Sequence, residues 1–261
     1  MQRGGVILKY YDKLLDMGVF SIYDIEKMVG NKNTAHSLVS AYIKKGYIQS
    51  VKRNLYVTIS LETKKPIVNK FVIASHVTGS SFISHHTAFE YYGMANQVFY
   101  ELYTSSETEF KSFWFDGYTY KYVQTKMNQG VNKASDDICV TDVERTVIDS
   151  IKDFEKIAGI EELLRCLEMI TFLDTTKLKK YLAAYDSQIL YQKVGYILSH
   201  FKASMKLDDD FFAFCKDKLN KSVRYFYNGI EKESPIYNNY WKLFVPAALL
   251  SVIDVGGNEI V

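Results

Sequence analysis

The chain has 261 residues, of which 48% are hydrophobic and 24% charged, and its net charge is +2. This length and composition fit one or two folded domains and exclude a chain kept disordered by excess charge. No apolar stretch reaches the roughly 18 residues that a membrane-spanning helix needs, and the first residues lack the unbroken apolar core of a secretion signal. We therefore expect a globular protein of the cytoplasm.

Positive charge is concentrated at the beginning of the chain. Residues 1–70 hold 12 Lys and Arg against 5 Asp and Glu, which gives this segment a net charge of +7. Residues 71–261 therefore carry a net charge of −5. The basic excess belongs to the N-terminal part of the chain.

Two short helices are predicted first. The first helix ends at Gly18 and is expected to bury apolar residues at helical spacing: Leu8, Tyr11, Leu15 and Val19. Ser21, with Asp24 three residues later, is typical of the N-cap of a second helix. The apolar face of this second helix consists of Ile22, Ile25, Met28 and Val29. Residues 30–33, Gly-Asn-Lys-Asn, are predicted to form the following turn.

A third helix, from about Thr34 to Lys45, separates an apolar face from a polar one. The apolar face comprises Ala35, Leu38, Val39, Tyr42 and Ile43. The polar face comprises Asn33, His36, Ser37, Ser40 and Lys44. Gly46 ends the helix, and two β-type runs follow, Tyr47–Val51 and Leu55–Ile59, joined by Lys52-Arg53-Asn54. These runs predict a hairpin with a basic tip.

Three short helices followed by a basic hairpin are the pattern of a winged helix-turn-helix that binds double-stranded DNA. Such a module places a helix in the major groove while cations beside it contact phosphates. The candidate DNA-binding residues are Lys32, Asn33, Thr34, His36, Ser37, Ser40, Lys44, Lys45, Lys52, Arg53 and Asn54. One helix covers few base pairs, so we expect promoter DNA with repeated half-sites. The alternative is a winged helix that binds protein.

Beyond a linker at residues 61–66 the pattern is mixed. Strands are expected at Phe71–Ala74, Val98–Tyr103, Phe113–Phe115 and Tyr118–Gln124, near Tyr225, and at Trp241–Val245. Asp116-Gly117 is a hairpin-turn signal. Helices are expected at Ser84–Tyr92, from a capping box of Thr141 and Glu144 to Ile151, and at 155–171, 175–185, 188–205 and 209–220.

The predicted fold class is α+β and mainly helical. A winged helix-turn-helix (residues 1–60) and a linker (61–66) precede a larger mixed α/β domain with a helical C-terminal part (67–261).

Three constellations resemble fragments of catalytic or metal sites. Glu109-Phe110-Lys111 matches the E-x-K fragment of metal-dependent nucleases, but no partner Asp stands on a preceding strand. His85-His86 with Glu90 resembles a metal pair without further ligands. Gly79-Ser80-Ser81 lacks the acidic pair of a nucleotidyltransferase. The scattered Cys139, Cys166 and Cys215 fit neither disulfides nor zinc. We expect no catalytic residues, metal or cofactor.

Two further segments give the chain a resemblance to a known family. They are FISHHTAFEYYGM (residues 82–94) and VTDVERTVIDSI (residues 140–151). Together with the basic hairpin and Leu55-Tyr56, they resemble AbiEi-family antitoxins, the regulators of type IV abortive-infection toxin–antitoxin operons that act in phage resistance. Asn54 departs from the family's usual Gly, although Asn tolerates a left-handed backbone better than most residues.

The resemblance implies a transcriptional repressor of its own operon that also counteracts a nucleotidyltransferase-type toxin. It implies no enzymatic activity. Two alternatives remain at this point: a nuclease that uses the winged helix for targeting, and a transcription regulator whose larger domain senses a small ligand.

Overall fold

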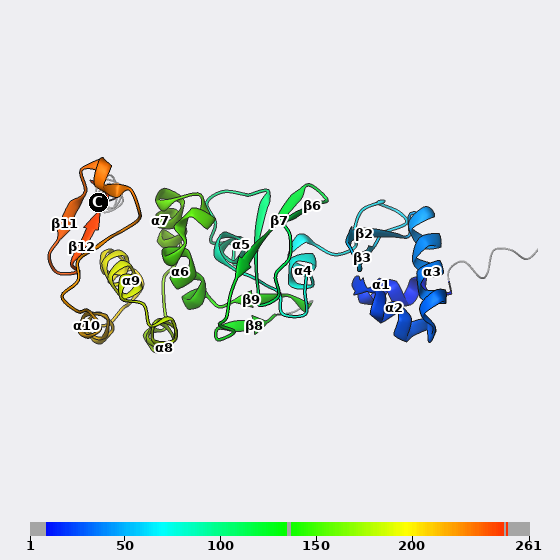
Figure 1. Cartoon of the computed structure of the whole chain (residues 1–261), viewed down its shortest axis with the longest axis horizontal. Helices are drawn as coiled ribbons and strands as arrows, with labels where there is room; N and C mark the ends of the chain where they lie inside the picture. Colours follow the sequence, from blue (N-terminus) through cyan, green and yellow to red (C-terminus); the bar gives the residue numbers. More distant parts are fainter. Residues whose placement is uncertain (1–8, 135–136, 248, 250–261) are drawn as a thin grey trace, which may run out of the picture. The chain divides into compact units, whose positions relative to one another are not determined.

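The computed structural model describes residues 9–134, 137–247 and 249, and its fold is mixed α/β (Figure 1). The chain divides into two compact units. Unit 1 comprises residues 1–83, 100–125 and 133–139, and unit 2 comprises 84–99, 126–132 and 140–261. No helix in the described ranges combines the length and apolar character needed to cross a membrane. A domain boundary at the linker 61–66 stays a prediction.

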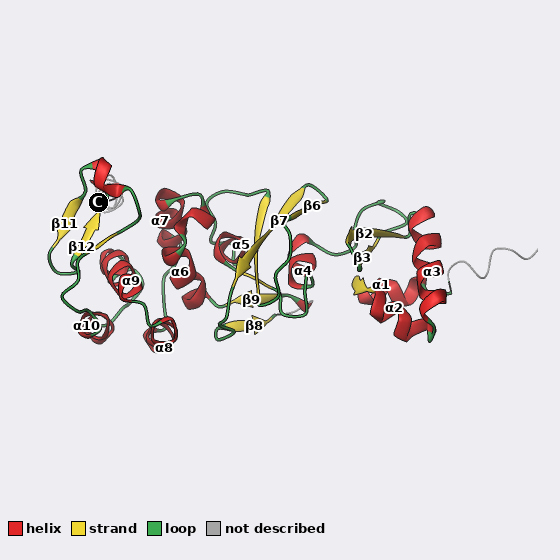
Figure 2. Ribbon diagram, viewed as in Figure 1, coloured by secondary structure: helices red, strands yellow, loops and turns green. Residues whose placement is uncertain are grey.

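Unit 1 begins with three helices and a three-stranded antiparallel sheet (Figure 2). In chain order the elements are α1 (Tyr11–Met17), β1 (Val19–Ser21), α2 (Ile22–Val29), α3 (Lys32–Lys44), β2 (Ile48–Lys52) and β3 (Leu55–Thr58). The strands are ordered β1-β3-β2. A shared apolar core joins helices and sheet and contains Tyr11, Leu14, Phe20, Ile22, Ile25, Ala35, Val39, Tyr42 and Ile48. We call residues 9–60 the N-terminal module.

The structure confirms the second helix and corrects details around it. Ser21 and Asp24 form the predicted capping box, each side chain bonded to the other residue's backbone N–H. In the first helix Leu14 is buried, whereas Leu15 is 38% exposed, because the helix begins only at Tyr11 and turns Leu14 inward. The predicted Leu8 lies outside the described residues. A turn over residues 30–33 was wrong, since α3 already begins at Lys32.

The rest of unit 1 corrects one predicted strand. Residues 70–75 form helix α4 (Lys70–Ser75) instead of a strand, because Asn69 accepts hydrogen bonds from Phe71 N and Val72 N and so caps a helix. A short apolar run has no periodicity that separates a buried strand from a buried helix.

A six-stranded sheet includes four strands of unit 1 and two, β8 and β9, that cross the division between the units. These strands are β4 (Phe82–Ile83), β5 (Glu101–Ser106), β6 (Phe113–Phe115), β7 (Tyr118–Gln124), β8 (Val131–Lys133) and β9 (Cys139–Thr141). Their order is β6-β7-β5-β4-β9-β8. The predicted turn between β6 and β7 is confirmed, because Asp116 and Gly117 both have positive φ and Phe115 pairs with Tyr118.

Unit 2 is largely helical. Its main elements are α5 (His85–Tyr91), α6 (Val143–Lys152), α7 (Ile160–Glu168), α8 (Thr175–Tyr185), α9 (Gln188–His200) and α10 (Asp209–Asp217). A sheet ordered β10-β12-β11 follows, formed by β10 (Arg224–Tyr225), β11 (Ile236–Asn238) and β12 (Leu243–Val245). The predicted helix at 155–171 is shorter, because a 3-10 turn (Phe154–Ile157) precedes α7. The N-cap of α6 is Asp142, which accepts from Arg145 N, and not the predicted Thr141.

A network of buried polar groups around Arg145 joins several elements of unit 2. Its guanidinium is 1% exposed and donates through Nε to Asp149 Oδ1 at 2.8 Å and through Nη1 to Gln129 O at 2.6 Å. The Tyr185 hydroxyl donates to the same Asp149 oxygen. Burial by itself would lower the pKa of Arg145, but the Asp149 carboxylate reverses the effect and raises it. The network joins α6, α8 and the loop before β8.

We expect Arg145→Met to destabilise unit 2 by about 3–5 kcal/mol, because it leaves the buried Asp149 carboxylate without its cation. The measurement is chemical denaturation followed by the fluorescence of Trp241, which is buried in unit 2, in a Trp114→Phe background. The control is Arg165→Met, which removes the exposed Arg165–Glu168 pair at 3.5 Å and should change little. Equal effects of the two substitutions would contradict this role of Arg145.

Candidate nucleic-acid interface

The helix α3 is held in place by a cap at its start and an apolar stripe along one side. Asn31 is the N-cap, and its side-chain oxygen accepts a hydrogen bond from Thr34 N at 3.0 Å. Ala35, Val39 and Tyr42 are buried in the core of the module. Helical periodicity then leaves the opposite side of α3 in solvent.

The polar side of α3 is exposed as predicted, with one correction on the apolar side. The exposed residues are Lys32, Asn33, Thr34, His36, Ser37, Ser40, Lys44 and Lys45, the last of which is the C-cap. Ile43, expected to be apolar core, is 41% exposed, because Tyr42 and Val39 fill the core at this end of the helix. The site therefore includes the apolar side chain of Ile43 within a polar, basic surface.

The hairpin tip separates its three predicted residues. Arg53 and Asn54 are exposed, and Asn54 adopts the expected left-handed backbone with φ +62°. Lys52 is part-buried instead. Its Nζ donates to Val77 O at 2.9 Å and lies 5.3 Å from the centre of the Phe110 ring. Burial lowers the pKa of the Lys52 ammonium.

A β-bulge explains why Lys52 points away from the tip. The pairing of β2 with β3 shifts register between Ser50 and Lys52, and the Ser50 hydroxyl donates to Lys52 O at 3.2 Å. A bulge interrupts the alternation of side chains along a strand and re-aims the residues next to it. Sequence reasoning missed Val77 and Phe110 as neighbours of Lys52, and no local pattern reports a contact over such sequence distances.

Four cations of this surface have no carboxylate partner among the residues that the structure describes. Within the described ranges, Lys32, Lys44, Lys45 and Arg53 form no ion pair, although Glu26 and Asp24 lie on the preceding helix. An exposed helix face with hydroxyl, amide and imidazole groups, beside unpaired cations, can donate hydrogen bonds to base edges and neutralise phosphates. The arrangement suits a polyanion.

The motifs that resemble fragments of catalytic or metal sites lie outside this surface. Glu109 and Lys111 are exposed in the loop after β5 and flank the buried Phe110. In unit 2, His86 Nε2 lies 3.3 Å from Glu162 Oε1, and its ring stacks on Phe99 with centres 3.6 Å apart. No group of three His, Cys, Asp or Glu side chains in the described part of the chain is arranged to hold a metal ion.

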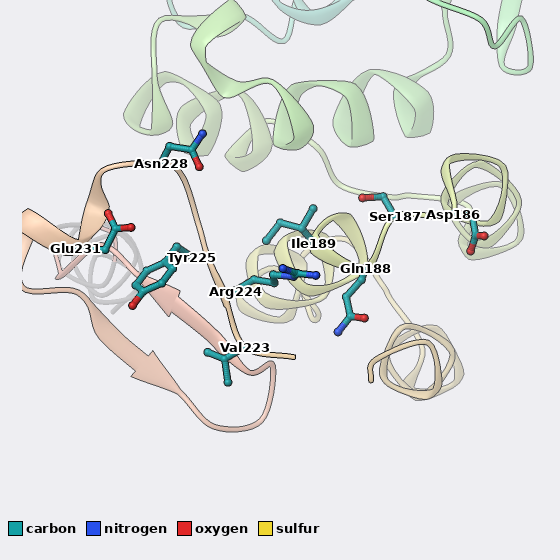
Figure 3. Close-up of a pocket in the computed structure, with 9 residues that line it drawn as sticks. All are labelled: Asp186, Ser187, Gln188, Ile189, Val223, Arg224, Tyr225, Asn228 and Glu231. Carbon is teal, nitrogen blue, oxygen red and sulfur yellow. The ribbon is translucent and has the colours of Figure 1, made fainter. Parts of the chain in front are cut away.

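Unit 2 also contains an open cleft of about 720 Å³ between the start of α9 and β10 (Figure 3). Its lining includes Arg224 and Gln188 as well as two carboxylates, Asp186 and Glu231. In Figure 3 Arg224 lies beside Ile189, while Asp186 and Glu231 lie at opposite sides of the view. With both signs of charge at its rim, the cleft favours no single class of ligand.

Comparison with solved structures finds a protein of similar fold. No family model matches the chain, and no curated protein matches it. The crystal structure of the RV2827C protein from Mycobacterium tuberculosis superimposes with a TM-score of 0.64. The match covers 96% of this chain and 94% of that chain at 10% sequence identity. The two chains share a fold over nearly their whole lengths.

The left-handed backbone at Asn54 yields a prediction for the tip. We expect Asn54→Gly to preserve or slightly stabilise the hairpin and Asn54→Val to destabilise it by about 1–2 kcal/mol, because a β-branched side chain clashes with the backbone at positive φ. The measurement is amide hydrogen exchange of β2 and β3 in the two variants. Equal protection in both variants would show that the tip does not require this conformation.

Proposed function

We propose that the N-terminal module is a winged helix-turn-helix that binds double-stranded DNA, with α3 as the reading helix and the β2–β3 hairpin as the wing. The observation that carries this proposal is the exposed polar face of α3, with lysines at both ends that form no ion pair among the residues the structure describes. Its amphipathic burial leaves Asn33, His36, Ser37 and Ser40 facing outward together. These groups have the reach and hydrogen-bonding capacity to contact base edges.

The connection between α2 and α3 supports the same function. Helix α2 ends at Val29 and is capped by Gly30, which has a left-handed backbone, and α3 starts at Lys32 behind the Asn31 cap. A tight turn of this kind joins the two helices of a helix-turn-helix motif and brings the N-terminal end of the second helix to the surface. Lys32, Asn33 and Thr34 occupy that end.

We further propose that the protein represses its own operon at repeated half-sites and counteracts a nucleotidyltransferase-type toxin. The support is the resemblance to AbiEi-family antitoxins in residues 82–94 and 140–151. The second segment supplies the Arg145 and Asp149 of the buried network, so its likeness lies in residues that hold the fold. The cleft of Figure 3 makes a ligand-sensing regulator the second candidate.

The DNA-binding proposal predicts that affinity for a duplex of the protein's own promoter falls as salt concentration rises, because cations of the module displace counterions from phosphates. Replacing Lys44 and Lys45 with Glu should weaken binding on the order of tenfold or more, regardless of sequence. Ser37→Ala and Ser40→Ala should instead alter the preference among base sequences. Fluorescence anisotropy over a salt series measures both effects.

The matched control is Lys180→Glu, which reverses an exposed charge on α8 in unit 2. This variant should bind DNA as the wild type does. The assignment of the interface is wrong if Lys180→Glu and the double α3 variant weaken binding equally, or if wild-type binding does not depend on salt.

A separate prediction concerns the toxin. We expect the Lys44→Glu, Lys45→Glu variant to lose repression but still restore growth to cells that express the cognate nucleotidyltransferase-type toxin, because in this proposal α3 serves DNA recognition alone. Growth after toxin induction measures rescue, and a promoter-reporter fusion in the same cells measures repression. Loss of rescue by a variant that folds normally, as judged by circular dichroism, would show that the two activities share this surface.

A further inference from the structure

We infer that Lys52 is a positioning residue whose contacts with Val77 and Phe110 hold the tip of the β2–β3 hairpin against the rest of unit 1. We call these contacts the clip. We infer also that Arg53 is the tip residue that contacts DNA phosphate. This inference rests on the proposed DNA-binding function. It assigns different roles to two adjacent cations that the sequence places together at the tip.

The side chains of Lys52 and Arg53 point in different directions. The bulge between Ser50 and Lys52 changes the alternation of side chains along β2. The Lys52 side chain therefore lies against the part of unit 1 outside the N-terminal module, while Arg53 remains exposed. The Lys52 ammonium donates to Val77 O at 2.9 Å, in the turn that follows α4. A hydrogen bond from a charged group is stronger than one between neutral groups, so the contact competes with release into solvent.

The ring that Lys52 contacts is itself packed against other aromatic rings. Lys52 Nζ lies over the ring of Phe110, which is 8% exposed. That ring packs edge-on against Tyr122 with centres 5.3 Å apart and against Phe113 at 6.2 Å. Phe113 in turn stacks on Tyr120 at 4.8 Å. The ammonium therefore lies over a ring that aromatic side chains of β6 and β7 hold in place, and partial burial lowers the pKa of Lys52.

The clip affects DNA recognition through the position of Arg53. A hairpin tip held at one point presents Arg53 in a limited range of positions relative to α3, and a preorganised contact costs less ordering on binding. Lys52 cannot neutralise a phosphate without leaving Val77 and Phe110. The Glu109-Phe110-Lys111 loop, whose spacing matches a nuclease fragment, then serves to place the Phe110 ring that holds the hairpin tip through Lys52.

The test uses the full chain and a duplex of its own promoter. Arg53→Met should lower the slope of log affinity against log salt by about 1, because one phosphate contact is lost. Lys52→Met should leave the slope unchanged and weaken binding about three- to tenfold at every salt concentration, since only preorganisation is lost. Lys52→Arg, which keeps a donor and a cation over the ring, should restore binding. A fall in slope with Lys52→Met equal to that with Arg53→Met would overturn the inference.

A second readout does not depend on DNA. Lys52→Met and Phe110→Leu should each accelerate amide hydrogen exchange at Arg53 and Asn54, and the double variant should add little to either change. Exchange in α3 should stay unchanged, which distinguishes a loosened tip from general unfolding. Unaltered exchange at the tip in Lys52→Met would refute the clip. If the wild type fails to bind DNA but the exchange results hold, the proposed function fails and the clip stands.

Discussion

Burial of a single guanidinium is the constraint on which unit 2 depends. Arg145 is removed from water, and an uncompensated charge there would cost several kcal/mol. Asp149 and the carbonyl of Gln129 compensate it only when α6 and the loop before β8 lie at hydrogen-bond distance. Tyr185 adds α8 through the same carboxylate. Such a network tolerates few arrangements of these elements, which favours one fold over close alternatives.

The N-terminal module depends on apolar burial instead. Tyr11 and Tyr42 both pack against the ring of Tyr47, with centres 5.6 and 5.4 Å apart, and the Tyr11 hydroxyl donates to Ile59 O. Burial raises the pKa of both Tyr11 and Tyr42. Because one side of α3 is committed to this core, its other side is presented to solvent as a single surface. The proposed reading face is thus a consequence of how the helix is packed.

The two neighbouring cations at the hairpin tip illustrate how local geometry divides similar residues between tasks. One register shift in β2 turns Lys52 towards Val77 and leaves Arg53 in solvent. By charge alone, Lys52 and Arg53 would be equivalent candidates for a phosphate contact. Through Phe110, the structure connects the hairpin tip to the aromatic rings of β6 and β7, so part of unit 1 outside the N-terminal module supports the hairpin that we propose to contact DNA.

Local patterns by themselves determined that the chain combines helices and strands, and they determined the Ser21 capping box, the Asp116-Gly117 turn, helix α8 at residues 175–185 and the exposed face of α3. Each depends on residues within a few positions of one another, so periodicity and capping chemistry suffice. Tertiary structure alone decided the helix at Lys70–Ser75, the exposure of Ile43, the network of Arg145 and the contact of Lys52 with Val77 and Phe110. These depend on which distant side chains fill a core or face a charge, and spacing along a single chain carries no record of such neighbours.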